Sequence, residues 1–277
     1  MDILKNKEGR LRNGWWIAIF FLLLSSFVFP IVYMSKESSF KISIWHQVVV
    51  IAMVSVICEW FRSGNLVQLV GRWNAANVRQ IFLAAAIGSC LMIAPAAVLT
   101  IFGAIVWQMG EADAGAIASG AAAMMGIAMA EEFLFRGFLF KRFMDGIGRW
   151  PAQFLIAAFF LLTHLNNPGM TGTTLVLASV NILTASLLFG FALIKTDNLM
   201  APIAMHFFTN FTQGIVLGFG VSGSHQTSLL KPGILVDQVW LTGGAFGLEA
   251  SFFGLATLVI VTYWYYTCDG HAAVSNQ

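Results

Sequence analysis

Stretches of about 20 apolar residues recur along almost the whole chain, and this feature constrains its fold more than any other. A helix rises about 1.5 Å per residue, so a stretch of this length crosses the roughly 30 Å of hydrocarbon in a bilayer. Charged residues make up only 10% of the chain, against about 25% in soluble domains. Hydropathy places eight such stretches at 14–34, 43–61, 80–108, 115–140, 151–166, 173–194, 200–219 and 240–267. The pattern predicts an all-α, polytopic transmembrane helical bundle of about eight spans.

The basic residues are distributed unevenly between the two ends of these spans. If every stretch crosses, eleven of the 15 Lys and Arg residues lie on the side of the N-terminus, and Arg136 lies inside a span. The other side holds only Lys36, Lys41 and Lys231. The positive-inside rule therefore predicts an integral, multi-pass membrane protein with both termini in the cytoplasm. The net charge of +2, without a basic run interleaved with aromatics, argues against a nucleic-acid partner.

The chain divides into three segments by the distribution of its polar residues. Residues 1–114 contain three spans, and residues 115–220 contain four spans that carry most of the intramembrane polar groups. Residues 221–277 form an outer loop, the last span and a cytoplasmic tail. The fourth span begins with the small residues GAIASGAAAMMG at 115–126, which favour close helix packing.

Two adjacent carboxylates and an arginine interrupt the apolar sequence of the fourth span. They are Glu131, Glu132 and Arg136, and each costs about 2.5–3.5 kcal/mol at membrane depth on insertion scales. Glu132 and Arg136 are four residues apart, so they lie on one helix face and can pair. Glu131 is rotated from that face by about 100°. The pattern indicates one carboxylate held by the arginine and a second that is free for chemistry or ligand binding.

Two further spans carry polar groups of catalytic type. The fifth span ends at His164, and the seventh contains His206 and Asn210, again four residues apart. By helix rise, Glu131 lies about 15 Å from Lys141, and the other three lie about 16–22 Å from the nearest cytoplasmic basic residue. With helix tilt these depths coincide, so we expect the four side chains to meet in the cytoplasmic half of the membrane.

The three motifs resemble, in their order and spacing, those of the CAAX prenyl protease type 2 and bacteriocin-processing family of intramembrane proteases. They read Glu131-Glu132-x-x-x-Arg136, Phe160-x-x-x-His164 and His206-x-x-x-Asn210. The resemblance covers roughly residues 115–220. It implies a helical intramembrane endopeptidase whose active-site cavity opens to the cytoplasm.

The resemblance also implies a role for each catalytic residue. Glu131 would activate the attacking water with help from His164. His206 and Asn210 would stabilise the oxyanion of the tetrahedral intermediate. A carboxylate in a lipid-embedded cavity suits a general base, because desolvation raises its proton affinity. Preorganised donors near the developing negative charge are usually the largest catalytic contribution.

The remaining motif residues are expected to support the site. Glu132 and Arg136 would form a supporting pair, and Phe160 would pack beneath the site. We expect the site to work without a cofactor. The alternative is zinc held by Glu131, His164 and His206, because two histidines and a glutamate can leave an open coordination position. The chain has no HExxH motif to favour that alternative.

Other polar residues in or near the spans have less specific interpretations. Glu249 either lines the cavity or accepts a hydrogen bond from a neighbouring hydroxyl or amide. Glu59 and Arg62 are expected to form a snorkelling pair at the interface. Asn181 and Thr184 are expected to form hydrogen bonds between helices.

Three functions follow from these observations. The preferred one is hydrolysis of a peptide bond near the membrane surface in a peptide or protein substrate, prenylated or bacteriocin-like. The second is a non-catalytic immunity or scaffold protein with the same fold. The third is a proton-coupled transporter, since intramembrane Glu and His also mark proton relays. A transporter would favour a two-fold internal repeat, and the sequence shows none.

Overall fold

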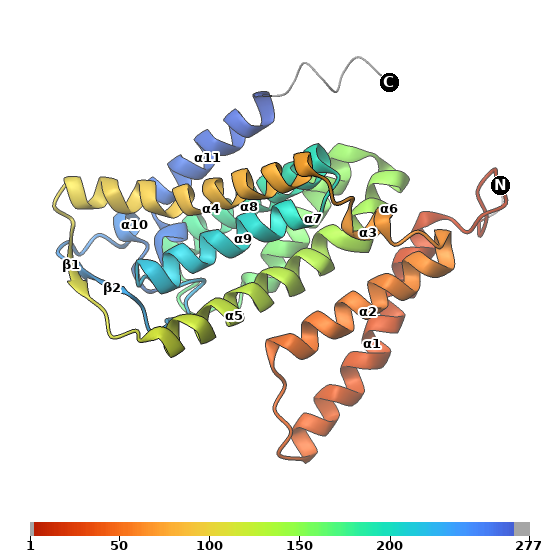
Figure 1. Ribbon diagram of the computed structural model, residues 1–277, viewed down its shortest axis with the longest axis horizontal. Coiled ribbons are helices and arrows are strands. Elements are labelled where there is room, and N and C mark those ends of the chain that lie inside the picture. Colours follow the sequence, from red (N-terminus) through yellow and green to blue (C-terminus); the bar gives the residue numbers. More distant parts are fainter. Residues whose placement is uncertain (1–2, 269–277) are drawn as a thin grey trace.

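The computed structural model describes residues 3–268, which form a helical bundle with one small two-stranded sheet (Figure 1). The principal helices are α1 (Asn13–Glu37), α2 (Ile44–Ser63), α4 (Ala75–Ile101), α5 (Ala114–Glu132), α6 (Phe138–Ile147), α7 (Arg149–His164), α8 (Gly172–Thr196), α9 (Met200–Phe211) and α11 (Phe252–Thr267). The short elements are α3 (Val67–Val70), the π-helical turns η1 (Phe133–Gly137) and η2 (Thr212–Val216), α10 (Val239–Thr242), and the 3-10 turns η3 (Gly244–Phe246) and η4 (Leu248–Ala250). Strands β1 (Ile105–Met109) and β2 (Leu230–Ile234) pair antiparallel.

The predicted all-α membrane bundle is confirmed, and each of the eight expected spans contains a helix. Within residues 3–268, five helical segments are long and apolar enough by themselves to cross a membrane: 13–37, 44–62, 75–101, 114–147 and 172–196. The other three expected spans contain shorter helices: α7 and α11 have 16 residues each, and α9 has 12 before it continues into η2. Each is shorter than the roughly 20 residues that cross hydrocarbon at right angles to the membrane. The expected spans also overran two helices, because residues 105–109 form β1 and residues 239–251 form short turns before α11.

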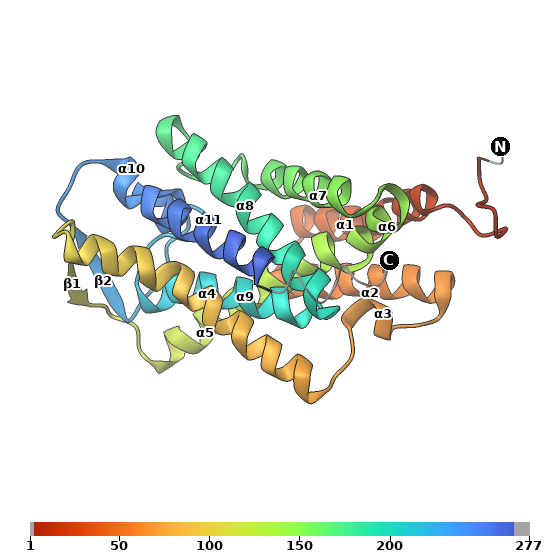
Figure 2. The same cartoon turned by 90° about the horizontal axis from the view of Figure 1, so that it is seen from above.

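Helix α9 occupies the centre of the bundle. It packs against α4, α5 and α8, while α7 packs against α8 and α11 packs against both α8 and α4. Figure 1 shows α1 and α2 as a hairpin that diverges from the other helices toward its turn, and Figure 2 shows α1 beside α6 in the view from above. This hairpin contacts the bundle through α5, η1 and α6. The arrangement places α5, which carries the first motif, directly against α9, which carries the third, and α8 joins them to α7, which carries the second.

The basic residues gather at one end of the bundle, which we call the basic end. There Asn198 Nδ2 donates to the Arg72 carbonyl at 2.9 Å and Lys141 lies 3.6 Å from Asp197. The ammonium of Lys195 donates to the Tyr265 carbonyl, so the last turns of α8 and α11 lie together. The opposite end contains the β1–β2 sheet, and we call it the hairpin end (Figure 1).

Small residues allow the close helix contacts that the sequence predicted. A Cβ atom at Gly120 would lie 2.4 Å from Ile215 Cδ1, and one at Gly126 would lie 2.7 Å from Ile44 Cγ2. Helices α4 and α9 approach backbone to backbone, since a Cβ at Gly88 would lie 2.2 Å from the Met205 carbonyl oxygen. Backbone atoms cannot move aside as a side chain can, so this contact fixes α9 in the bundle.

We predict that Gly88→Ala lowers the stability of the bundle by about 1–3 kcal/mol, the usual cost of overpacking. The matched control is Gly14→Ala in α1, because a Cβ there would meet nothing within 4 Å. Thermal unfolding of the detergent-solubilised protein measures both. A Gly88→Ala protein as stable as Gly14→Ala would contradict the close packing of α4 and α9.

Candidate active site

The two carboxylates lie where α5 gives way to a π-helical turn. Glu131 and Glu132 are the last residues of α5, and Arg136 lies in η1. The second π-helical turn, η2, begins two residues after Asn210. Such turns are rare and occur mostly as bulges within helices, frequently at functional sites. Two of the three motifs therefore adjoin an irregular turn of this kind.

Glu132 is held on both sides by charged or ionisable partners. Its side chain is 0% exposed, and its Oε1 lies 2.9 Å from Arg136 Nη1 and 2.9 Å from His206 Nδ1. Arg136 also donates from Nη2 to the Ser186 hydroxyl at 2.5 Å and to the Ser186 carbonyl at 3.2 Å. Buried charges need such partners, because an isolated charge loses its hydration.

Aromatic rings enclose the same guanidinium. The Arg136 Cζ lies 4.8 Å from the ring centroid of Phe160, 5.5 Å from Phe189 and 5.8 Å from Phe135. Phe189 also stacks on the imidazole of His206, with centroids 5.0 Å apart. Ring faces attract cations, most strongly in desolvated surroundings. Phe160 therefore contacts Arg136 and also lies 4.5 Å from the His164 ring centroid.

Glu131 differs from Glu132 in that it faces open space. Its side chain is 27% exposed, and its carboxylate lies between two histidines. His164 Nε2 is 4.0 Å from Glu131 Oε1, and His206 Nε2 is 3.7 Å from Glu131 Oε2. Both distances exceed that of a direct hydrogen bond. The predicted division between one held and one free carboxylate is what the geometry shows.

The hydrogen bonds of the two histidines identify which ring nitrogens face Glu131. The Phe160 carbonyl lies 2.8 Å from His164 Nδ1, and because a carbonyl only accepts, Nδ1 carries a proton. His206 Nδ1 also carries a proton, because it lies next to the carboxylate of Glu132, which only accepts. Nε2 of each ring is therefore the nitrogen available to a reactant, and in neutral His164 it is an acceptor.

A cavity of about 350 Å³ adjoins this cluster. Its lining includes Glu131, His164, His206 and Asn210, so the structure brings together all four residues predicted as catalytic. Asn181 also lines it, and the Nδ2 of this buried side chain has no hydrogen-bond partner within residues 3–268. Asn181 thus offers a donor to a molecule in the cavity.

Glu249 satisfies both interpretations that the sequence left open. It lines the cavity and accepts hydrogen bonds from the Ser222 backbone amide at 2.5 Å, the Ser222 hydroxyl at 3.1 Å and Gln213 Nε2 at 3.3 Å. Gln213 lies in η2, and Ser222 lies in the loop that follows it. Glu249 therefore holds the loop 217–226 against the end of α9.

Some contacts of the site were missed or misassigned from the sequence. Ser186 and Phe189 on α8 were missed, although a serine among apolar residues was a visible signal for the first. Thr184 was expected to bond between helices, but its hydroxyl donates to the Val180 carbonyl of its own helix. Glu59 and Arg62 pair at 3.7 Å as expected, yet Glu59 is buried rather than interfacial.

The zinc alternative is not supported by the arrangement of the side chains. Within residues 3–268, no three His, Cys, Asp or Glu side chains are placed so that they could hold a metal ion. In the set proposed from the sequence, Glu131, His164 and His206, the two histidines face different oxygens of one carboxylate.

The cavity extends from the cluster toward the hairpin end. Its exposed lining residues are Gln47, Pro168, Ser224 and Gln226, which lie near the start of α2 and in the loops after α7 and η2. The opposite wall is closed by Phe160, Phe189 and the buried Glu132–Arg136 pair. The exposed part of this lining and the basic residues lie at opposite ends of the bundle. The cytoplasmic orientation expected for the basic end and for the cavity stays a prediction.

Comparison with known families bears on the same segment of the chain. Residues 113–212 match the family model described as type II CAAX prenyl endopeptidase Rce1-like. This confirms, over that segment, the resemblance read from the motifs. The segment contains all three motifs, from Glu131 to Asn210, and almost coincides with the predicted core at 115–220. Neither the search of curated proteins nor that of solved structures found a match.

We predict that Arg136→Met destabilises this Rce1-like segment by about 3–5 kcal/mol, because it leaves the carboxylate of Glu132 buried without its guanidinium. The double variant Glu132→Gln/Arg136→Met removes both charges and is expected to recover part of the loss. Arg149→Met, at an exposed arginine, is the control. Thermal unfolding in detergent compares them, and equal stabilities of Arg136→Met and Arg149→Met would contradict this role of the pair.

Proposed function

We propose that the chain is a membrane-embedded peptidase that hydrolyses a peptide bond with a water molecule activated by Glu131. The observation that supports this most strongly is the free carboxylate of Glu131 between two histidine Nε2 atoms at the end of a cavity. The match of residues 113–212 to a prenyl endopeptidase family supports the same reaction class.

Glu131 and His164 are placed to bind one water molecule between them. Their 4.0 Å separation is close to the distance between two acceptors that share a water at about 2.8 Å from each. The carboxylate takes a proton as the water oxygen attacks the scissile carbonyl carbon. His164 Nε2 accepts the second hydrogen bond of that water and so orients its lone pair toward the substrate.

The negative charge then develops on the former carbonyl oxygen. Asn210 lies one turn from His206 on α9, and both line the cavity. The Asn210 amide donates while uncharged, and Nε2 of His206 donates when that ring is protonated. Such donors stabilise the tetrahedral oxyanion. When the intermediate collapses, the C–N bond breaks and the proton held by Glu131 passes to the leaving amine.

We predict that Glu131→Gln lowers the rate of peptide cleavage by about 10²–10⁴-fold, since the amide keeps the shape of the side chain but cannot take a proton. Purified protein is incubated with a fluorogenic farnesylated CAAX peptide and with a pool of unmodified peptides. The control is Glu111→Gln, at an exposed glutamate that precedes α5. A chelator arm tests whether a metal takes part.

Cleavage by the wild type that persists in Glu131→Gln would contradict Glu131 as the base. Cleavage of neither substrate by folded wild-type protein would favour the non-catalytic scaffold over the peptidase. Preference for the farnesylated peptide would identify prenylated proteins as substrates, and preference for the unmodified pool would identify the substrate as another class of peptide.

We further propose that substrates enter from the non-cytoplasmic side. The basic end carries most of the lysines and arginines, so the positive-inside rule orients it toward the cytoplasm. The mouth of the cavity lies at the hairpin end, lined by Ser224 and Gln226. Peptides that reach the opposite face of the membrane would then meet Glu131 without crossing the bundle.

We predict that a cysteine introduced as Ser224→Cys reacts with a membrane-impermeant maleimide on intact cells. Cys58, Cys90 and Cys268 are first replaced by alanine, and Lys7→Cys at the basic end is the matched site that should react only after permeabilisation. Labelling is measured by gel shift. The reverse pattern would place the mouth in the cytoplasm and the basic end outside, without bearing on whether the protein is a peptidase.

A further inference from the structure

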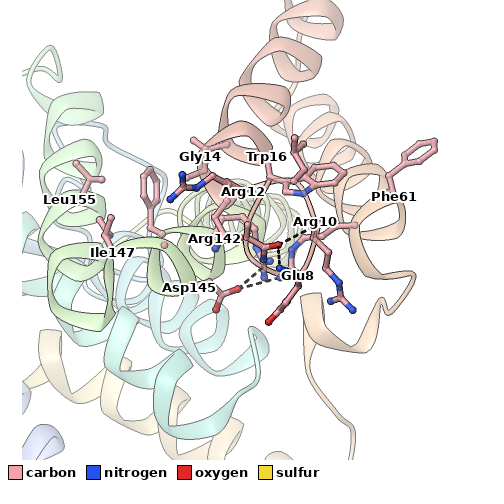
Figure 3. Close-up of a pocket in the computed structure, with 17 residues that line it drawn as sticks. Glu8, Arg10, Arg12, Gly14, Trp16, Phe61, Arg142, Asp145, Ile147 and Leu155 are labelled. Carbon is pink, nitrogen blue, oxygen red and sulfur yellow. Dashed lines mark hydrogen bonds and ion pairs between the residues drawn. The ribbon is translucent and has the colours of Figure 1, made fainter. Parts of the chain in front are cut away.

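A second and larger cavity lies at the basic end, away from the candidate active site. Its volume is about 1080 Å³, and it is bounded by the N-terminal segment before α1, the first turns of α1, the end of α2, α6 and α7. It shares no lining residue with the cavity next to Glu131. Figure 3 shows the charged and aromatic side chains that surround this space.

The charged residues in this cavity are mainly arginines. Arg10, Arg12, Arg62 and Arg142 line it, against the carboxylates of Glu8 and Asp145. Arg62 is already shared between two acids, since it lies 3.7 Å from Glu59 and 3.4 Å from Asp145. Asp145 is therefore divided between Arg62 and Arg142, and the cavity retains an excess of positive charge.

Arg142 is the residue that points to an anionic ligand. It is only 3% exposed, and its Nε has no hydrogen-bond partner within residues 3–268. Nη1 lies 3.2 Å from the Asp145 carboxylate, and the guanidinium rests over the Phe138 ring at 5.4 Å. A buried donor without an acceptor is unfavourable, and more so when it is charged. An anion in the cavity would supply the acceptors.

Apart from Asn6 and Asn13, the remainder of the lining is mainly apolar. Trp16, Ile17, Ile147 and Leu155 line the cavity, and Figure 3 shows Trp16, Ile147 and Leu155 beside the charged centre. A small hydrated ion would leave this surface uncovered. A molecule with an anionic head and an apolar body would contact both parts, as lipids do in basic pockets beside transmembrane helices.

We propose that this cavity binds the phosphate group of an anionic phospholipid, with Arg142 as its buried partner and Arg10 and Arg12 at its rim. The phosphate oxygens accept from the guanidinium groups, and the acyl chains lie along the apolar wall toward the membrane. The site lies at the end that the positive-inside rule places against the anionic cytoplasmic leaflet. Loss of hydration weakens the competition of water for these charge-assisted bonds.

The test measures lipid retention by native mass spectrometry of the full chain released from detergent. Short-chain phosphatidylglycerol is titrated beside phosphatidylcholine of the same chain length, and inorganic phosphate is titrated separately. Arg142→Gln is expected to weaken phosphatidylglycerol binding by about tenfold, the loss of one strong charge-assisted bond. Arg10→Gln, at an exposed rim position, is expected to weaken it several-fold without risk to folding.

The matched control is Arg79→Gln, which removes one exposed arginine from the same end but outside the cavity. It should leave binding unchanged. Equal retention of phosphatidylcholine, or equal losses in Arg10→Gln and Arg79→Gln, would overturn the proposal in favour of general attraction to a basic surface. Binding of inorganic phosphate that is as tight and equally sensitive to Arg142→Gln would overturn the lipid as the ligand.

Discussion

A carboxylate and a guanidinium cannot be left alone in an apolar bundle, and Glu132 and Arg136 are both fully buried where α5 ends. Their ion pair draws in partners from three other helices: Ser186 on α8, His206 on α9 and the Phe160 ring on α7. The need to satisfy two buried charges thus joins the segments that carry all three motifs. It also fixes the ring of His206 so that Nε2 faces Glu131.

The same pair leaves Glu131 free. Adjacent residues on a helix point in directions about 100° apart, so a partner set built around Glu132 cannot also surround Glu131. Glu131 instead borders a cavity with two imidazole nitrogens near its oxygens. Identical side chains one residue apart therefore have different surroundings, one structural and one suited to proton transfer. The π-helical turn η1 adjoins both.

The two cavities lie at opposite ends of one bundle and differ in chemistry. The smaller is lined by carboxylates, imidazoles and amides at the hairpin end, and the larger by arginines and aromatic rings at the basic end. A lipid bound beside α6 would hold the helix that directly follows the Glu132–Arg136 turn. A lipid bound at the basic end would then support the geometry of the candidate active site, whose cavity extends toward the hairpin end.

The sequence predicted the helical membrane class and the convergence of Glu131, His164, His206 and Asn210, because charges in apolar spans need partners and motif spacing fixes helix faces. The prediction of span ends failed where hydropathy does not show that the chain changes direction. Residues 105–109 are apolar enough to extend a span, yet Gly103 adopts positive φ and the chain turns into β1. The end at which the cavity opens depends on which loops cover it. The hydrogen bond from the Ser222 amide to Glu249 holds one of these loops, and it joins residues that are distant in sequence.

The central claim is that Glu131 and His164 act as a unit on one water molecule, and a double-variant cycle in kcat/KM tests it most directly. Glu131→Gln, His164→Gln and the double variant are compared with wild type on the peptide that wild type cleaves best. If the two residues share one water, the double variant loses little more than Glu131→Gln alone, because residues that act together give strongly non-additive losses. Losses that multiply would show independent roles and would contradict the account.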